Sequence, residues 1–149
     1  MIQHEVSIYL HRPVDQVFIF LADPTKQPAW QSDLIEIEQL TAGPMRVGTR
    51  IREVRRVGRR RAEYQAEVSA FEPDKRFALQ VITGPRVALS YSFEAEEGGT
   101  RLRYHFAMHT SGIMRVLEPL ILRSLRKQSV SDFARLKGIL AGEARCRRR

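Results

Sequence analysis

The first ten residues alternate between apolar and polar side chains. Five side chains would share one face of an extended chain: Ile2, His4, Val6, Ile8 and Leu10. A period of two predicts a strand with one buried face. Pro13 ends this pattern, and apolar residues then recur at helical spacing, which predicts a short amphipathic helix over residues 13–22. Asp23-Pro24 ends that helix, and we expect a short connection with one more helical turn over residues 25–30.

Six later segments also have the length and alternation of strands. They cover residues 34–40, 49–57, 61–72, 77–81, 86–96 and 101–108. Turn signals rich in Gly and Pro separate them, which predicts consecutive antiparallel pairing. Within residues 49–57, Ile51, Val54 and Val57 break strict alternation, so we expect a bulge or a strongly twisted edge there.

From Ile113 onward the apolar period lengthens to three and four residues. The stripe contains Leu117, Ile121, Leu125, Phe133, Leu136 and Leu140. Pro119 lies inside it, so we expect a short leading helix, a kink and a long helix to about residue 141, stopped by Gly142. One amphipathic helix can cover one face of a sheet, so the pattern predicts a single α+β domain over residues 1–142. We expect residues 143–149 to form a basic, disordered tail.

The chain of 149 residues carries a net charge of +8, and arginine is concentrated in residues 50–61 and in the tail. Such a positive charge is typical of proteins that bind nucleic acid or an anionic membrane. No aromatic residue interrupts these basic runs, as single-strand binding would require, so we favour solvated surface charge. Peripheral contact with an anionic membrane stays open. For residues 50–61 we favour a charged hairpin that prevents edge pairing over a cationic mouth for a carboxylated lipid.

Residues suited to metal binding or covalent catalysis are scarce. The one cysteine, Cys146, cannot form an internal disulfide, and no Cys and His have zinc spacing. His105 and His109 lie in a strand pattern, where residues four apart are about 13 Å apart and cannot share an ion. Glu53 could point inward beside arginines, although we favour an ion pair at a strand edge. Neither a nucleophile motif nor a phosphate loop occurs, so we predict no metal and no cofactor.

The cellular location is predicted from patterns that are missing. The start of the sequence lacks the basic and apolar regions of a secretion signal, and no window holds the roughly 20 apolar residues that span a bilayer. Together with the single cysteine, these features lead us to expect a cytoplasmic protein.

Several short motifs occur in an order that carries a family resemblance. They are His11 to Phe18 around Pro13, Asp23-Pro24 through Trp30, Gly48-Thr49-Arg50, Ala70-Phe71-Glu72-Pro73, Gly99-Thr100-Arg101-Leu102, and Leu117-Glu118-Pro119-Leu120 followed by Phe133 to Lys137. The chain resembles the polyketide cyclase/dehydrase and lipid transport family of the START-like (SRPBCC, Bet v 1-like) superfamily. The resemblance implies the helix-grip fold: a curved antiparallel sheet of seven strands around a long C-terminal helix, with two short helices after the first strand. It does not select one function, because the superfamily includes carriers, receptors and cyclases.

A cavity between sheet and helix is the candidate site. If the concave face carries the apolar alternation, the sheet would contribute Tyr64, Val68, Phe77, Leu79, Leu89, Tyr91, Phe93, Leu102, Tyr104 and Phe106. The helix would contribute Leu117, Leu120, Ile121, Ser124, Leu125 and Gln128. Unpaired in a sealed core, Ser124 and Gln128 would each cost about 1–3 kcal/mol, so they either face a wet cavity or flank the stripe and reach solvent. The tyrosine hydroxyls either contact a ligand or lie at the rim.

Three functions are compatible with these features. The first is binding or carriage of a small lipid-like, polyketide-like or aromatic molecule. The second is a cyclase or aromatase, for which Tyr64, Tyr91, Tyr104 and Glu53 are the acid–base candidates. The third is a basic module that binds RNA or an anionic membrane. We expect a monomer or a weak dimer.

Overall fold

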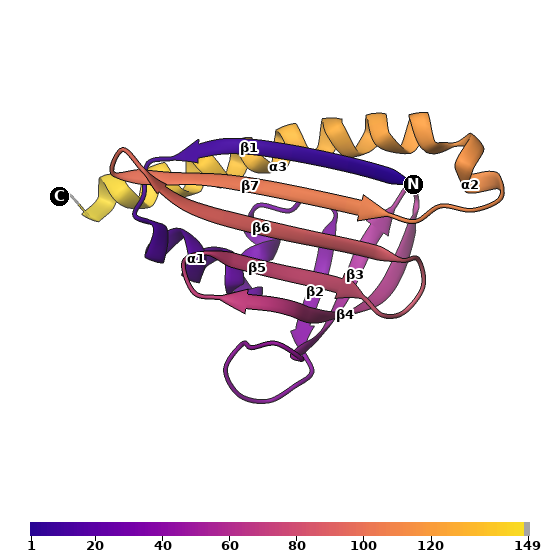
Figure 1. Ribbon diagram of the computed structural model, residues 1–149, viewed down its shortest axis with the longest axis horizontal. Coiled ribbons are helices and arrows are strands. Elements are labelled where there is room, and N and C mark those ends of the chain that lie inside the picture. Colours follow the sequence, from indigo (N-terminus) through magenta and orange to yellow (C-terminus); the bar gives the residue numbers. More distant parts are fainter. Residues whose placement is uncertain (148–149) are drawn as a thin grey trace.

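Seven strands form one antiparallel sheet in a computed structural model that describes residues 1–147, with side chains described through residue 142. The strands are β1 (Ile2–Leu10), β2 (Leu34–Gln39), β3 (Arg50–Val57), β4 (Arg60–Glu72), β5 (Arg76–Val81), β6 (Val87–Glu96) and β7 (Gly99–Met108). Their order across the sheet is β1-β7-β6-β5-β4-β3-β2, so β1 and β2 lie at opposite edges (Figure 1). The predicted seven-stranded antiparallel sheet is confirmed.

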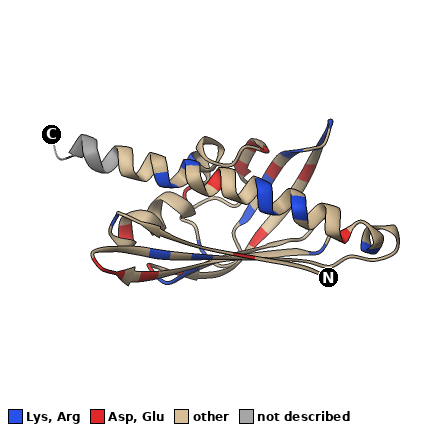
Figure 2. Ribbon diagram, turned by 90° about the horizontal axis from the view of Figure 1, so that it is seen from above, with Lys and Arg blue, Asp and Glu red and all other residues tan. Residues whose placement is uncertain are grey.

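Two short helices connect β1 to β2, as predicted. They are α1 (Val14–Ala22), which follows Pro13, and η1 (Pro24–Ala29), a 3-10 helix in which the Asp23 side chain accepts a hydrogen bond from the Thr25 backbone N–H. After β7 come α2 (Ile113–Val116) and α3 (Glu118–Arg147). Figure 2 shows α3 lying over the sheet, with the β3–β4 hairpin rising beside it. The α+β architecture with a long C-terminal helix packed on the sheet is therefore confirmed.

The break between α2 and α3 agrees with the expected kink, because Pro119 lies in the first turn of α3, where its missing N–H breaks no helical hydrogen bond. The predicted stop at Gly142 is wrong, since α3 continues to Arg147. A glycine inside a helix costs only about 1 kcal/mol relative to alanine. The disorder expected for residues 143–149 falls outside the residues whose side chains the structure describes.

Strand β3 corrects the expectation of a bulge over residues 49–57. It pairs with β4 without a register shift, and the irregularity lies in β2, between Leu34 and Glu36. Ile51 and Glu53 are buried on the inner face, and Arg55 follows them in phase two residues later. The alternation looked broken because two charged residues occupy inward positions of a regular strand.

The hydrophobic core fills the end of the sheet that α1 covers, at the left of Figure 1. Phe18 of α1 packs edge-to-face on Phe71 and Phe93, at centroid distances of 5.3 and 5.1 Å. Leu136 and Leu140 of α3 close the same cluster and are almost fully buried. Among the described residues, no comparable cluster covers the opposite end of the inner face.

Candidate functional site

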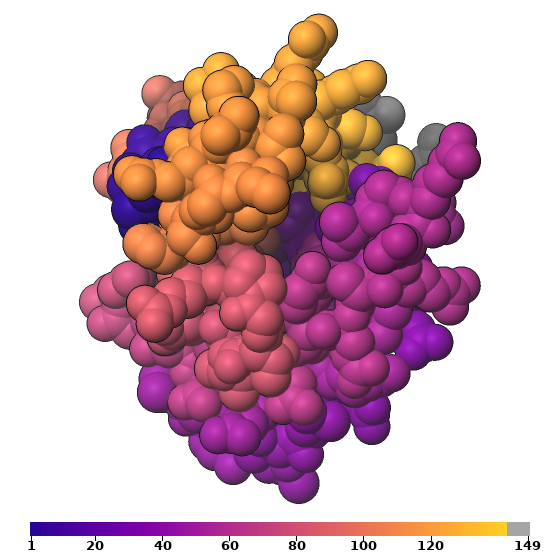
Figure 3. Space-filling view, turned by 90° about the vertical axis from the view of Figure 1, so that its right-hand side faces the viewer, coloured from indigo at the N-terminus to yellow at the C-terminus, as the bar shows by residue number. Residues whose placement is uncertain are grey.

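A cavity of about 390 Å³ lies between the inner face of the sheet and α3. Its opening is bounded by Ser124 of α3, by Val57 and Gly58 of the β3–β4 hairpin, and by Pro85 of the β5–β6 turn. Figure 3 looks at this end of the molecule and shows the hollow between the orange α2–α3 segment and the magenta hairpin. The cavity is therefore an open pocket that reaches inward from one end of the sheet.

Nine of the predicted site residues line this cavity. They are Tyr64, Leu79, Leu89, Tyr91, Tyr104, Phe106, Ser124, Leu125 and Gln128. Ser124 is exposed and Gln128 is half-buried, so the two polar positions of α3 both face the cavity and lie near its rim. The role of these nine side chains as ligand contacts stays a prediction.

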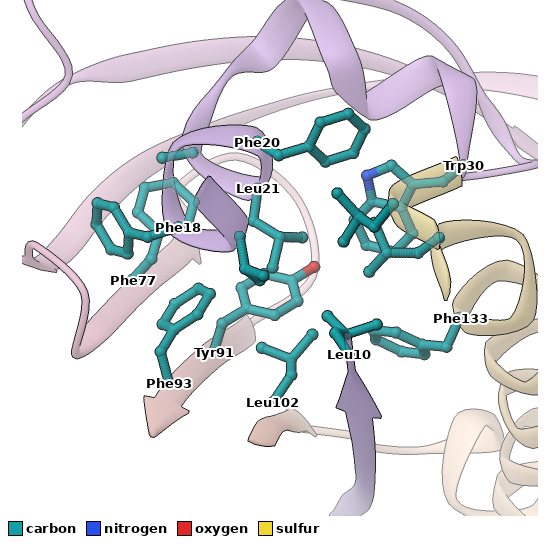
Figure 4. Close-up of a cluster of buried hydrophobic side chains, with 14 of the residues drawn as sticks. Leu10, Phe18, Phe20, Leu21, Trp30, Phe77, Tyr91, Phe93, Leu102 and Phe133 are labelled. Carbon is teal, nitrogen blue, oxygen red and sulfur yellow. The ribbon is translucent and has the colours of Figure 1, made fainter. Parts of the chain in front are cut away.

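The other seven predicted residues lie elsewhere. Val68, Phe77, Phe93 and Leu102 belong to the hydrophobic core on the α1 side, part of which Figure 4 shows. They share the inner face with the cavity residues, but α1 and Trp30 fill the space in front of them. Leu117 is 39% exposed and Leu120 is 64% exposed, and neither they nor Ile121 are among the residues that line the cavity.

A second hollow, of about 440 Å³, lies outside the first, against the loop that precedes α2. Pro85, Arg86, His109 and Met114 are among the residues that line it. It is a surface depression bounded by few side chains, whereas the inner cavity has the sheet on one side and α3 on the other. We therefore place the candidate ligand site in the inner cavity.

A polar cluster around Arg55 lies at one wall of the cavity. Its Nε donates to Glu53 Oε2 at 2.9 Å, Nη1 donates to Asp33 Oδ1 at 2.9 Å, and Nη2 donates to Gln31 Oε1 at 2.7 Å. These bonds use three of the five N–H donors of the guanidinium. Burial by itself would lower the pKa of Arg55, but the carboxylates of Glu53 and Asp33 raise this pKa overall. Arg55 is therefore a charged group that its own chain already holds in place.

Sequence reasoning found only part of this cluster. Glu53 does form an ion pair, but it is 7% exposed and faces the cavity, so the expected position at a solvent-exposed strand edge is wrong. Gln31 and Asp33, which follow η1, were not singled out. Asp132 of α3 was missed as well; it is 6% exposed, lines the cavity and accepts a hydrogen bond from the Ser32 backbone N–H at 3.2 Å. The strand period could have revealed the cluster. Glu53 and Arg55 lie two and four residues after the buried Ile51, so all three side chains point to the same face of β3.

Tyr91 and Tyr104 bring two hydroxyls to the cavity. Burial raises the pKa of both phenols, so each stays protonated and able to donate a hydrogen bond. Among the described residues neither hydroxyl has a protein hydrogen-bond partner, and the one sealed polar side-chain atom that lacks a partner is Trp30 Nε1. Both hydroxyls therefore remain accessible from the cavity. In Figure 4 the Tyr91 hydroxyl points toward the side on which Trp30 and Phe133 lie.

Aromatic rings form the inner wall of the cavity. Phe133 of α3 packs on Trp30 and Tyr104, at centroid distances of 5.5 and 5.2 Å, and Tyr104 lies 5.2 Å from Tyr91. Neither Trp30 nor Phe133 was predicted as a site residue, because each was interpreted as a structural position of its helical segment. Such a wall offers offset and edge-on packing to a flat apolar molecule.

His4 of β1 ties the sheet edge to α3 beside the cavity. Its Nε2 lies 2.9 Å from Ser129 Oγ, and its ring is edge-on to Tyr104. Burial, with a smaller contribution from Arg126, lowers the pKa of His4 below its ordinary value of 6.5. The folded protein therefore releases this proton at a pH where the unfolded chain still holds it.

The stability of the protein should consequently fall as the pH is lowered through this window. We expect the urea midpoint to drop between about pH 7 and pH 5, because protons then favour the unfolded chain. The His4→Gln variant should show a flatter profile. The His105→Gln variant should behave as wild type, since His105 is on the outer face near Glu5. Equal profiles for His4→Gln and wild type would contradict this assignment.

The remaining sequence candidates are surface groups. On the outer face of β3, Arg52 pairs with Glu63 at 2.8 Å, and His109 is exposed. Among the residues whose side chains the structure describes, no group of three or more His, Cys, Asp or Glu is placed to hold a metal ion. No helix in the described part of the chain is long and apolar enough to cross a membrane.

Comparisons with known proteins agree with this geometry. The chain is similar over its length to three solved structures: TTHA0849 from Thermus thermophilus (15% identity, TM-score 0.81, 95% of this chain and 99% of that one), the di-domain ARO/CYC BexL from the BE-7585A biosynthetic pathway (17%, 0.74, 93% and 46%) and Ara h 8.0201 (15%, 0.73, 95% and 98%). At such identities the similarity shows the fold alone, which is the Bet v 1-like helix grip. No curated protein matches the sequence.

The sequence itself carries the family assignment. Residues 1–138 match the family described as "Polyketide cyclase / dehydrase and lipid transport". The match covers β1 through most of α3, including every strand and the whole wall of the cavity. The chain therefore belongs to the polyketide cyclase/dehydrase and lipid transport family.

Proposed function

We propose that this protein binds and carries a small hydrophobic molecule, aromatic or polyketide-like, in the cavity between the sheet and α3. The main support is the combination of an open cavity of about 390 Å³, an aromatic inner wall and two unpaired tyrosine hydroxyls. This volume lies within the range of about 300–1,000 Å³ that is usual for small-molecule sites. The walls would supply affinity through apolar burial, and the hydroxyls would orient the ligand.

The charges in the cavity favour a neutral ligand over an anionic one. Three carboxylates line it, those of Asp33, Glu53 and Asp132, against two guanidinium groups, the largely enclosed one of Arg55 and the exposed one of Arg56. Arg55 is already neutralised by two of those carboxylates, so it offers little attraction to a further anion. Hydroxyl groups on the ligand would satisfy both kinds of partner, because they donate to carboxylates and accept from tyrosines. This supports a neutral, hydroxylated ligand and argues against a carboxylated lipid at this site.

A matched pair of fluorescent probes tests this selectivity. N-phenyl-1-naphthylamine is neutral, and 8-anilino-1-naphthalenesulfonate has the same ring system with a sulfonate. We expect the neutral probe to bind about tenfold more tightly or better, because the sulfonate would face excess carboxylates at short range. Glu53→Gln should reduce the difference in affinity between the two probes. Glu63→Gln should leave that difference unchanged, since Glu63 is on the outer face of the sheet. Equal affinities for both probes in the wild-type protein would refute the charge argument.

Native mass spectrometry of the purified protein tests the carriage itself. We expect a hydrophobic molecule bound in stoichiometric amount, recoverable by solvent extraction. A clean mass of the free protein, together with no binding of either probe, would count against a ligand cavity.

The cavity supports catalysis less well than binding. A general acid or base acts best when its pKa is near the operating pH. Burial raises the pKa of Tyr91 and Tyr104 away from neutrality, so these two phenols remain protonated hydrogen-bond donors and do not exchange protons readily. We therefore rank the cyclase or aromatase alternative second.

A further inference from the structure

We propose that the segments around the cavity opening form a docking face for an anionic lipid bilayer. This mouth face consists of α2 with the start of α3, the tip of the β3–β4 hairpin, and the β5–β6 turn. The contact with the bilayer is inferred from surface residues alone and does not depend on the proposed carrier function. Only the exchange of a ligand at that contact rests on the proposed function.

The mouth face carries an unusual concentration of exposed apolar side chains. Of twelve exposed large hydrophobic residues in the described chain, five lie within residues 113–120. Ile113 is 80% exposed, Val116 is 79% exposed and Leu120 is 64% exposed. Val57 at the hairpin and Ile82 at the β5–β6 turn add exposed aliphatic groups on the other two segments. Residues so exposed contribute little to the core, so their clustering calls for a partner.

These segments are the same ones that frame the opening of the cavity. Val57, Pro85 and Ser124 belong to the cavity lining, and each lies in one of the three segments. In Figure 3 the hollow is bounded by the orange α2–α3 segment, the magenta hairpin and the salmon β5–β6 turn. A surface that covered the apolar tips would therefore also cover the opening.

Basic residues flank the apolar tips on all three segments. Arg59, Arg60 and Arg61 are exposed at the hairpin, Arg86 follows the β5–β6 turn, and Arg123 lies on the first turns of α3. Within the described residues none of these five arginines forms an ion pair. Figure 2 shows the hairpin tip in blue at the same end of the molecule as the start of α3. The nearby Glu118 accepts hydrogen bonds from the N-terminal ammonium group and from Thr110, so its charge is already engaged.

This combination of groups fits a bilayer better than a nucleic acid or an acidic protein. Single-stranded nucleic acids stack on aromatic side chains, and protein interfaces are enriched in Tyr and Trp. The exposed large hydrophobic side chains of the mouth face are aliphatic or Met. Aliphatic tips ringed by arginine suit a surface whose acyl chains lie beneath anionic headgroups. With the opening pressed against that surface, an apolar ligand would enter or leave without crossing bulk water.

Vesicle co-sedimentation of the full chain, without any ligand, tests the docking face. Vesicles of phosphatidylcholine with about 30% phosphatidylglycerol should pull the protein down, and pure phosphatidylcholine should bind it far less. Replacing Arg59 and Arg60 by Gln should weaken binding about fivefold per arginine. Val116→Asp should weaken it by about tenfold or more, because the aspartate cannot enter the acyl region.

Val130→Asp is the matched control for Val116→Asp. Val130 is 74% exposed on α3, a similar exposure, but it is not part of the mouth face. Its replacement should leave vesicle binding unchanged. Equal losses in both variants, or equal binding to both vesicle types, would overturn the proposal. Binding to polyglutamate or RNA in place of vesicles would assign the face to an acidic polymer instead.

The two proposals fail separately. Probe binding is measured without vesicles and vesicle binding is measured without probes. Binding of the neutral probe without binding of vesicles would support the carrier function and refute the docking face. Binding of vesicles without binding of the probe would support the docking face and refute the carrier function.

Discussion

Replacing Arg55 with methionine is expected to lower the free energy of unfolding by about 3–5 kcal/mol. The change leaves the carboxylates of Glu53 and Asp33 without their positive partner while both remain largely enclosed. We expect the lower end of that range, since the Arg55 side chain keeps 20% of its surface exposed and water can relieve part of the penalty. Urea unfolding followed by circular dichroism measures the difference.

Arg52→Met provides the control on the same strand. Arg52 pairs with Glu63 on the outer face, where water screens both charges, so its loss should matter far less. Adding Glu53→Gln and Asp33→Asn to Arg55→Met should recover much of the lost stability, because the uncompensated charges are then gone. If Arg55→Met is no more harmful than Arg52→Met, the inner cluster has no special electrostatic role.

Phe133→Ala is expected to lower the free energy of unfolding by about 3–5 kcal/mol and to enlarge the inner end of the cavity. Phe133 is 5% exposed and packs on Trp30 and Tyr104, so its removal leaves space that these rings cannot fully close. The added space should favour a larger neutral probe, such as pyrene, over N-phenyl-1-naphthylamine. Urea unfolding and parallel fluorescence titrations measure the two effects.

Leu136→Ala separates the two consequences. Leu136 is fully buried one turn further along α3 but does not line the cavity. Its loss should destabilise the fold by about 2–5 kcal/mol without changing the preference between the two probes. A shift in preference as large as that of Phe133→Ala would mean that general loosening, and not cavity size, controls ligand choice.

Local periodicity along the chain was enough to predict most of the fold. The alternation of β1 placed His4 on the inner face, and the change of period at Ile113 marked the transition to the C-terminal helices. Those signals are reliable because the direction of a side chain follows from the repeat of the backbone. This repeat is two residues in a strand and 3.6 residues in a helix. The cluster at Arg55 escaped the same reasoning, since charged residues at inward positions look like a broken pattern.

The cavity itself was predicted only in part, and the reason lies in α1. Phe77 and Tyr91 belong to the same inner face of the sheet, yet Phe77 lies wholly in the core whereas Tyr91 lines the cavity. Alternation cannot distinguish them, because it reports which face a side chain takes and not what stands in front of that face.

The amino-acid sequence by itself determined the strands, the helices, their order and the inward face of most strands, because these follow from spacing between neighbouring residues. Only the tertiary structure decided where α1 and Trp30 fill the inner face and where it stays open. It also decided that Glu53 and Asp33, twenty residues apart in the chain, meet on Arg55. Packing between distant segments sets both outcomes, and no local period records which segments will meet.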